Sequence, residues 1–272
     1  MTDDIIDLPF PQLNRNQQKG SKPRCHLLLS GAKAAVARRL TTLIAPFGEV
    51  TAENSWMPDG FTCCQEAQLT TAERIISDQH LRDSLLNWWL AVPGVSKPTT
   101  PNWDIASTCK IDGEPGILLI EAKAHDAELR NEERGKPLGK EDGKGVATET
   151  RRNHVSIGAC IQEASLALSG ETGLPWALSR DWNYQMANRF AWAWKLTELG
   201  KPVILVYLGF LGCEEMPIPI RNEQHWRELV EDHSRTLFPR EVWNKSWTVH
   251  GHVLIPLIRV YDQRLDSRGI LS

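Results

Sequence analysis

The sequence predicts an α/β protein in which a mixed β-sheet is flanked by helices. Helical patterns lie before and after two strand patterns, at residues 103–111 and 116–123, which the strong turn signal DGEPG separates. A further apolar run of strand length, PVILVYLGFLG at residues 202–212, favours a strand that is covered on both faces. Because helices and strands alternate along the chain, we expect the helices to pack on the faces of the sheet.

The N-terminal part of the chain predicts an extension followed by helices. Residues 1–24 are acidic and then polar, with little to bury, and we expect a flexible extension before a single domain over residues 25–272. Ser30 is the expected N-cap of a helix through residues 31–45. A second helix is expected over residues 78–92, where polar residues precede an amphipathic pattern.

The C-terminal half predicts three helices and a last strand. Residues 124–147 are rich in charge and glycine, and we expect a long mobile loop or an irregular excursion there. An amphipathic helix is expected over residues 155–170, and another over residues 181–200. An acidic helix at residues 222–238 and an apolar strand at residues 252–262 follow.

Composition is that of an ordinary soluble globular protein. The chain has 272 residues, which is enough to bury a core without disulfide bonds. No apolar run is long enough to cross a bilayer, and the polar N-terminus is unlike a secretory signal, so we expect a cytoplasmic protein with no membrane partner. The formal net charge is −3, so any contact with nucleic acid would depend on a local basic patch.

Cysteine and tryptophan are both expected in the core. The six cysteines are scattered without a CxxC pair, which argues against a zinc site and against a disulfide framework. We expect Cys109 and Cys160 to be small core residues in a reducing compartment. The eleven tryptophans could stack on bases, but burial is the commoner use, and we expect most of them to be buried.

Three charged residues are expected to meet where the two strands of the hairpin end. Side chains on a strand alternate between its faces, so Glu121 and Lys123 share one face. A hairpin closed at the DGEPG turn places Asp104 opposite about residues 122–124. A solvated ion pair at the strand end, with Asp104 capping a turn, is the alternative. Exposed pairs contribute little to stability, so stability is a weak reason for this arrangement.

A divalent cation would explain why two carboxylates lie together. Adjacent carboxylates repel each other, and each costs energy to desolvate. Mg²⁺ or Mn²⁺ removes both penalties, because these ions prefer oxygen ligands from Asp, Glu and water. A lysine beside such an ion can orient or deprotonate an attacking water, or neutralise charge that develops on a phosphate.

These residues carry a resemblance to a known family. The sequence resembles the PD-(D/E)XK nuclease superfamily, whose pattern is an acidic residue at the start of one strand and E-x-K on the next. Asp104 and Glu121-Ala122-Lys123 match this pattern, although Trp103 replaces the proline that normally precedes the aspartate.

The resemblance implies a fold, a cofactor and roles for residues. It implies a restriction-endonuclease-like fold with an αβββαβ core over about residues 70–212. Asp104 and Glu121 would bind Mg²⁺ or Mn²⁺ with the backbone carbonyl of Ala122, and Lys123 would assist the water. The first strand of that core has no clear sequence signal.

Further residues are weighed against ordinary structural roles. The family commonly adds an upstream acid, for which Glu66 and Glu73 are equal candidates, and a glutamine or lysine on the helix after the loop, where Gln162 is a match. His125, Asn153 and His154 could contact substrate or simply lie in the loop. The basic residues in and after the loop could bind phosphates; they are Arg130, Arg134, Lys136, Lys140, Lys144, Arg151 and Arg152. The loop also contains a balancing set of acids, which is what a solvated loop shows by default.

The leading hypothesis is a metal-dependent nuclease that hydrolyses phosphodiester bonds of nucleic acid, DNA before RNA. The alternative is a catalytically inactive protein of the same fold that binds DNA or another protein, because a fold does not fix a function. A hydrolase of a small phosphorylated substrate at the same site is a third reading. The sequence leaves specificity, exo- or endonuclease action and oligomeric state open, a homodimer included.

Overall fold

The computed structural model describes residues 19–95, 99–138 and 146–265, and it contains a mixed α/β domain. The strands are β1 (Trp56–Met57), β2 (Ala67–Gln68), β3 (Asn102–Trp103), β4 (Ile105–Ile111), β5 (Glu114–Lys123), β6 (Val203–Leu211), β7 (Trp247–Val249) and β8 (His252–Asp262). The α-helices are α1 (Ser21–Leu28), α2 (Lys33–Ile44), α3 (Gln79–Trp89), α4 (Asp126–Arg130), α5 (Thr148–Thr172), α6 (Tyr184–Glu198) and α7 (Glu223–Ser234).

The main sheet has six strands in the order β1-β4-β5-β6-β8-β7. The β4–β5 hairpin is antiparallel, whereas β5 pairs in parallel with β6, and β6 in parallel with β8. The short strands β1 and β7 pair antiparallel at the two edges. The predicted mixed sheet flanked by helices is therefore confirmed, and β2 and β3 form a separate two-stranded ribbon.

The β4–β5 hairpin closes through the predicted turn. Asp112 and Gly113 both have positive φ, 51° and 84°, which a tight two-residue hairpin turn requires and which glycine adopts without strain. The resulting register pairs Ile105 with Ile120. Asp104 therefore stands level with Glu121, whereas the sequence placed it opposite about residues 122–124.

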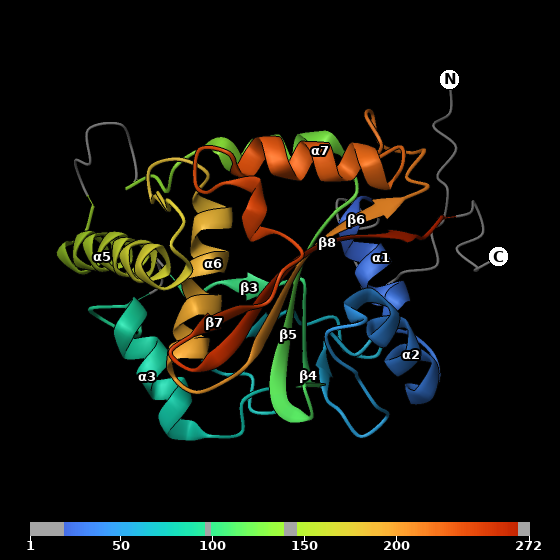
Figure 1. Ribbon diagram of the computed structural model, residues 1–272, viewed down its shortest axis with the longest axis horizontal. Coiled ribbons are helices and arrows are strands. Elements are labelled where there is room, and N and C mark those ends of the chain that lie inside the picture. The colour runs from blue at the N-terminus through green and yellow to red at the C-terminus, as the bar shows by residue number, and fades with distance from the viewer. Residues whose placement is uncertain (1–18, 96–98, 139–145, 266–272) are drawn as a thin grey trace.

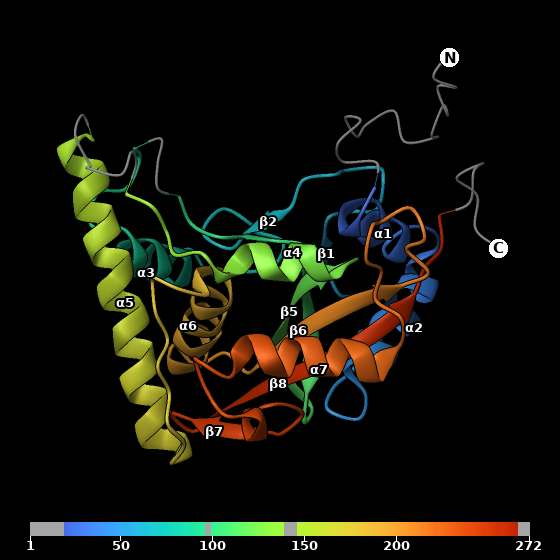
Figure 2. The ribbon, with the colours of Figure 1, turned by 90° about the horizontal axis from the view of Figure 1, so that it is seen from above.

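Helices cover both faces of the sheet. Figure 1 shows α3, α5 and α6 on one side and α1 and α2 on the other, and Figure 2 shows the same separation from above. The near-continuous apolar character of β6 follows from this arrangement, because its side chains are buried from Val203 to Phe210. Each fully buried aliphatic side chain of this kind contributes about 1.5–3 kcal/mol.

Tryptophans form much of the core beneath α3, α5 and α6. Trp89, Trp192 and Trp194 are buried, and the rings of Trp89 and Trp192 meet edge-on with their centroids 5.6 Å apart. Cys109 and Cys160 are buried as predicted, and no disulfide bond joins any of the six cysteines, all of which lie in the described part of the chain.

The largest differences from the sequence-based expectations lie near the N-terminus. Residues 1–18 fall outside the described residues, but residues 21–24, expected in the flexible extension, instead begin α1. Arg24 in this helix is fully buried and forms an ion pair with Glu215. The helix predicted after Ser30 is present as α2, but Ala32 precedes it and makes no side-chain cap.

The other predicted helices are present, with changed limits. Asp78 caps α3 by accepting hydrogen bonds from two backbone N–H groups. The expected irregular segment at residues 124–147 contains α4 and a short 3₁₀ helix at Asn131–Glu133, and residues 139–145 lie outside the described part. Helix α5 runs past Gly170 and ends at Gly173, which has positive φ. None of the described helices combines the length and apolarity that a bilayer crossing needs.

Candidate active site

Asp104 lies in a bend between β3 and β4, beside the end of β5. Its Oδ2 atom accepts a hydrogen bond of 2.8 Å from the backbone N–H of Ala122. Because Ala122 stands between Glu121 and Lys123, the carboxylate of Asp104 lies against the segment that carries both of these residues. The structure therefore brings together the three side chains that the sequence singled out.

Glu121 and Lys123 form a buried ion pair. Only 1% of Glu121 and 6% of Lys123 is exposed, and the ammonium group of Lys123 donates to Oε1 of Glu121. Both side chains extend from the face of β5 that α6 covers, which is also the face of Leu119. The alternative of a solvated strand-end pair is therefore wrong, because almost no water reaches either charge.

Helix α6 supplies two partners of Glu121 that the sequence analysis missed. Gln185 donates a hydrogen bond of 2.5 Å to Oε1, and Arg189 donates one of 2.7 Å from Nε to Oε2. These residues are four positions apart, so they share one side of the helix. The available signal was a Gln and an Arg at this spacing in the mostly apolar sequence YQMANRFAWAW. Gln162, the glutamine proposed from the sequence, is instead exposed on α5.

The two carboxyl groups have opposite electrostatic environments. Burial and the nearby carboxylate of Glu121 raise the pKa of Asp104 well above its ordinary value. Burial alone would also raise the pKa of Glu121, but the positive charges of Arg189 and Lys123 outweigh it and lower that pKa to about 2. Glu121 is thus a permanent anion, and Asp104 is a carboxyl group that holds its proton more readily.

A third carboxylate, that of Glu66, lies close enough to Asp104 to contribute to its raised pKa. The β2–β3 ribbon pairs Ala67 with Trp103, which places Glu66 level with Asp104. The carboxylate of Glu66 also forms an ion pair of 2.7 Å with Lys22 of α1. Glu73, the other upstream acid proposed from the sequence, is 79% exposed at its side chain and pairs with Arg82. Of these two acids, Glu66 is therefore the one that lies at the site.

A groove of about 400 Å³ opens beside Asp104. Its walls come from β3, the segment before it, the segment after α4, and α6. The lining residues are Glu66, Thr99, Thr100, Pro101, Asn102, Asp104, Lys136, Tyr184, Gln185, Asn188 and Arg189. The groove is polar and open at the surface, so an extended polar substrate can reach Asp104 more readily than an apolar one.

Lys136 lines this groove and comes from the charged segment at residues 124–147. Its Nζ atom lies 4.8 Å from the ring centroid of Tyr184, and burial lowers its pKa. The backbone of Lys136 is fixed, because its N–H donates to Arg180 and its carbonyl accepts from His154 Nε2 at 2.9 Å. The backbone from which this side chain extends is therefore held in place by the fold.

The other polar residues proposed from the sequence have structural partners or lie elsewhere. Asn153 makes two hydrogen bonds to the backbone of Val92, and His154 is occupied with Lys136. His125 lies 3.7 Å from Glu128. Four of the remaining basic residues do not line the groove: Arg130, Arg134, Arg151 and Arg152. The other two, Lys140 and Lys144, lie outside the described residues.

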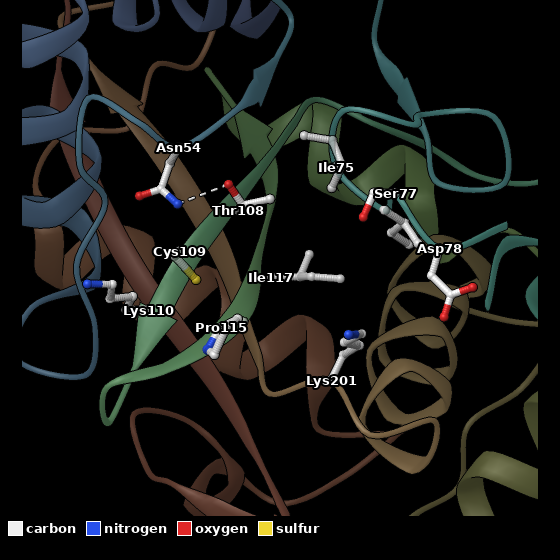
Figure 3. Close-up of a pocket in the computed structure, with 12 residues that line it drawn as sticks. Asn54, Ile75, Ser77, Asp78, Thr108, Cys109, Lys110, Pro115, Ile117 and Lys201 are labelled. Carbon is white, nitrogen blue, oxygen red and sulfur yellow. Dashed lines mark hydrogen bonds between the residues drawn. The ribbon is translucent and has the colours of Figure 1, made fainter. Parts of the chain in front are cut away.

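A second cavity lies at the opposite end of the hairpin. It has a volume of about 320 Å³, and Figure 3 shows Cys109, Lys110, Ile117 and Lys201 among the residues that line it. It shares no lining residue with the groove beside Asp104. The candidate active site and this cavity are therefore separate features.

The described residues beside the groove offer oxygen ligands to a divalent cation but form no ready-made metal cluster. Within the described parts of the chain, no group of three or more His, Cys, Asp or Glu side chains is arranged to hold a metal ion. Asp104, Glu121 and the carbonyl group of Ala122 nevertheless form an all-oxygen donor set, which suits Mg²⁺ or Mn²⁺ with water as further ligands. A cation would also relieve the repulsion that raises the pKa of Asp104. The donor chemistry fits, provided that Glu121 releases one oxygen from its present partners.

Comparison with protein-family models, with curated proteins and with solved structures finds no match for this chain.

Proposed function

We propose that this protein is a metal-dependent nuclease that hydrolyses phosphodiester bonds of nucleic acid, DNA before RNA. One observation carries the proposal: Asp104 accepts a hydrogen bond from Ala122, between Glu121 and Lys123, at the side of an open polar groove. Two acids can hold a divalent cation that activates a water for attack on a phosphodiester, and a lysine beside them can orient that water or neutralise charge on the phosphate.

The order of the secondary structure supports a restriction-endonuclease-like fold. Helix α2, strands β1, β4 and β5, helices α5 and α6, and strand β6 follow one another in the order αβββααβ, which corresponds to the αβββαβ core when α5 and α6 together take the place of its second helix and the short α4 is left out. The core then begins at Lys33 and not at about residue 70. In this reading β1 is the first strand of the core, which is only two residues long and has no sequence signal of its own. Helix α3 and the β2–β3 ribbon are then insertions between β1 and β4.

In this proposal the side chains would have two roles, binding the cation and orienting the water. Asp104 and Glu121, with the carbonyl group of Ala122, would hold the cation. A bound divalent cation polarises the phosphate and lowers the pKa of its water. The ammonium group of Lys123, which donates to Glu121, would orient that water. The burial of this lysine keeps the strength of its electrostatic interaction high.

Cleavage of DNA tests this proposal directly. Purified protein with Mg²⁺ or Mn²⁺ should cleave a mixture of single-stranded and double-stranded DNA, and chelation should stop the reaction. Asp104→Asn and Lys123→Met should each lower the rate by at least about a hundredfold. Glu73→Gln is the matched control, because it removes an exposed acid outside the groove. Cleavage that survives both active-site substitutions would refute the assignment.

One observation favours a second function, an inactive protein of the same fold that binds DNA or another protein. Both carboxylate oxygens of Glu121 are already occupied, Oε1 by Lys123 and Gln185 and Oε2 by Arg189. A site whose acid is neutralised internally has less need of a metal ion. Titration calorimetry distinguishes the two functions: retained DNA binding with no uptake of Mg²⁺ or Mn²⁺ would favour the binding protein.

A further inference from the structure

Arg189 connects the two chain segments that carry the acids. Its Nε atom donates to Oε2 of Glu121 on β5, and one terminal nitrogen donates to the backbone carbonyl of Asn102 on β3, each at 2.7 Å. The other terminal nitrogen donates to Asn188 at 2.9 Å, and the guanidinium carbon lies 4.6 Å from the ring centroid of Trp103. All three guanidinium nitrogens are thus engaged.

These contacts matter because strand pairing leaves Asp104 outside the ladder. Asp104 stands in a bend between β3 and β4, and the pairing of β4 with β5 begins only at Ile105. The two residues before Asp104 are Asn102 and Trp103, both of which Arg189 contacts. The guanidinium group therefore holds the segment that leads into Asp104 against the carboxylate of Glu121.

This set of contacts requires an arginine, and a contribution to stability alone is a poor explanation for it. A planar guanidinium can donate in three directions and stack on a ring at the same time, whereas an ammonium is a point charge on a flexible stem. Arg189 is 6% exposed and Glu121 1%, so both charges are desolvated, and a buried ion pair contributes little net stability after that cost.

We propose that Arg189 is a positioning residue, whose guanidinium group ties the Asn102–Trp103 segment to Glu121 and thereby keeps the Asp104 carboxylate on the Ala122 N–H. The separation of the two acids is then set by the protein before any cation binds. The catalytic consequence of this role rests on the proposed nuclease function, but the positioning itself does not.

Hydrogen exchange of the Ala122 amide measures the positioning without any metal or substrate. The amide is protected by Asp104, so its exchange rate reports whether that hydrogen bond persists. NMR of labelled protein would compare the wild type with Arg189→Lys, which keeps the charge, and Arg189→Met, which removes it. Amides of β6 serve as internal references, because that strand lies in the centre of the sheet.

Arg82→Met is the matched control protein. Arg82 is also buried, at 4% exposure, and donates to the backbone carbonyls of Ile76 and Ser77, but it lies outside the groove. Its loss should lower the melting temperature without selective loss of Ala122 protection.

The expected result is a selective fall in Ala122 protection, by at least about tenfold, in both Arg189 variants. Wild-type protection in Arg189→Lys would overturn the proposal, because positive charge alone would then suffice. Equal loss of protection at Ala122 and in β6 would overturn it as well, since it would show general destabilisation. If the wild type cleaves DNA, both variants should lower kcat with KM within about twofold. A wild type that cleaves nothing refutes the nuclease proposal and leaves the exchange result to be judged separately.

Discussion

Asp104 and Ala122 are joined by a hydrogen bond of 2.8 Å from the backbone N–H of Ala122 to the Asp104 carboxylate. This bond continues the pairing of the hairpin for one more position, after β4 has given way to a bend. It also fixes an acid whose pKa is raised beside one whose pKa is lowered.

The raised pKa of Asp104 predicts a loss of stability as pH rises. Because the folded-state pKa exceeds the unfolded one, the unfolded chain releases this proton first, and the contribution of Asp104 is fully present only below its ordinary pKa. That contribution is lost as pH rises through the folded-state pKa. Between about pH 4 and pH 8, the free energy of unfolding measured in urea should fall by at least about 1 kcal/mol more for the wild type than for Asp104→Asn. Identical pH profiles for the two proteins would contradict this prediction.

Lys136 is predicted to bind a substrate phosphate. Its ammonium group lines the groove, and its backbone is fixed by His154. Lys136→Gln should raise KM for a DNA substrate about fivefold or more with little change in kcat. It should also reduce the slope of log binding constant against log salt concentration by about the amount of one phosphate contact. Lys201→Gln, in the separate cavity of Figure 3, is the control and should leave both quantities unchanged.

Gly135 is predicted to control the position of Lys136 without carrying a charge. A Cβ atom at Gly135 would lie 2.2 Å from the backbone oxygen of Asp181, so Gly135→Ala must push the two segments apart. We expect a cost of about 1–3 kcal/mol in unfolding free energy, together with a rise in KM similar to that of Lys136→Gln. Gly170→Ala is the control, because a Cβ there meets nothing within 4 Å and alanine favours the helix. An unchanged KM in Gly135→Ala would contradict the prediction.

The hairpin and the main helices could be predicted because their signals are local. The Asp112–Gly113 turn, the apolar run of β6 and the start of α3 are each signalled by a few consecutive residues. The approach of Asp104 to Glu121 followed from the hairpin register, with an error of one to three positions in the pairing, because residues 122–124 were expected opposite Asp104.

The missed features depend on residues that are distant in the sequence. Arg24 is buried in α1 because Glu215, 191 positions away, neutralises it, so the local pattern reads as a solvated segment. Glu66 reaches the groove only through the two-residue pairing of β2 with β3. Arg189 meets Glu121 across 68 positions, and no periodicity along α6 reveals that partner.

Binding of Mn²⁺, followed by electron paramagnetic resonance, tests the central claim most directly, because it asks whether Asp104 and Glu121 share a cation. The account predicts that the wild type binds Mn²⁺, that Asp104→Asn and Glu121→Gln each weaken the binding by at least about tenfold, and that Glu73→Gln binds as the wild type does. A wild type that binds no Mn²⁺, or an Asp104→Asn protein that binds it as tightly as the wild type, would contradict the account.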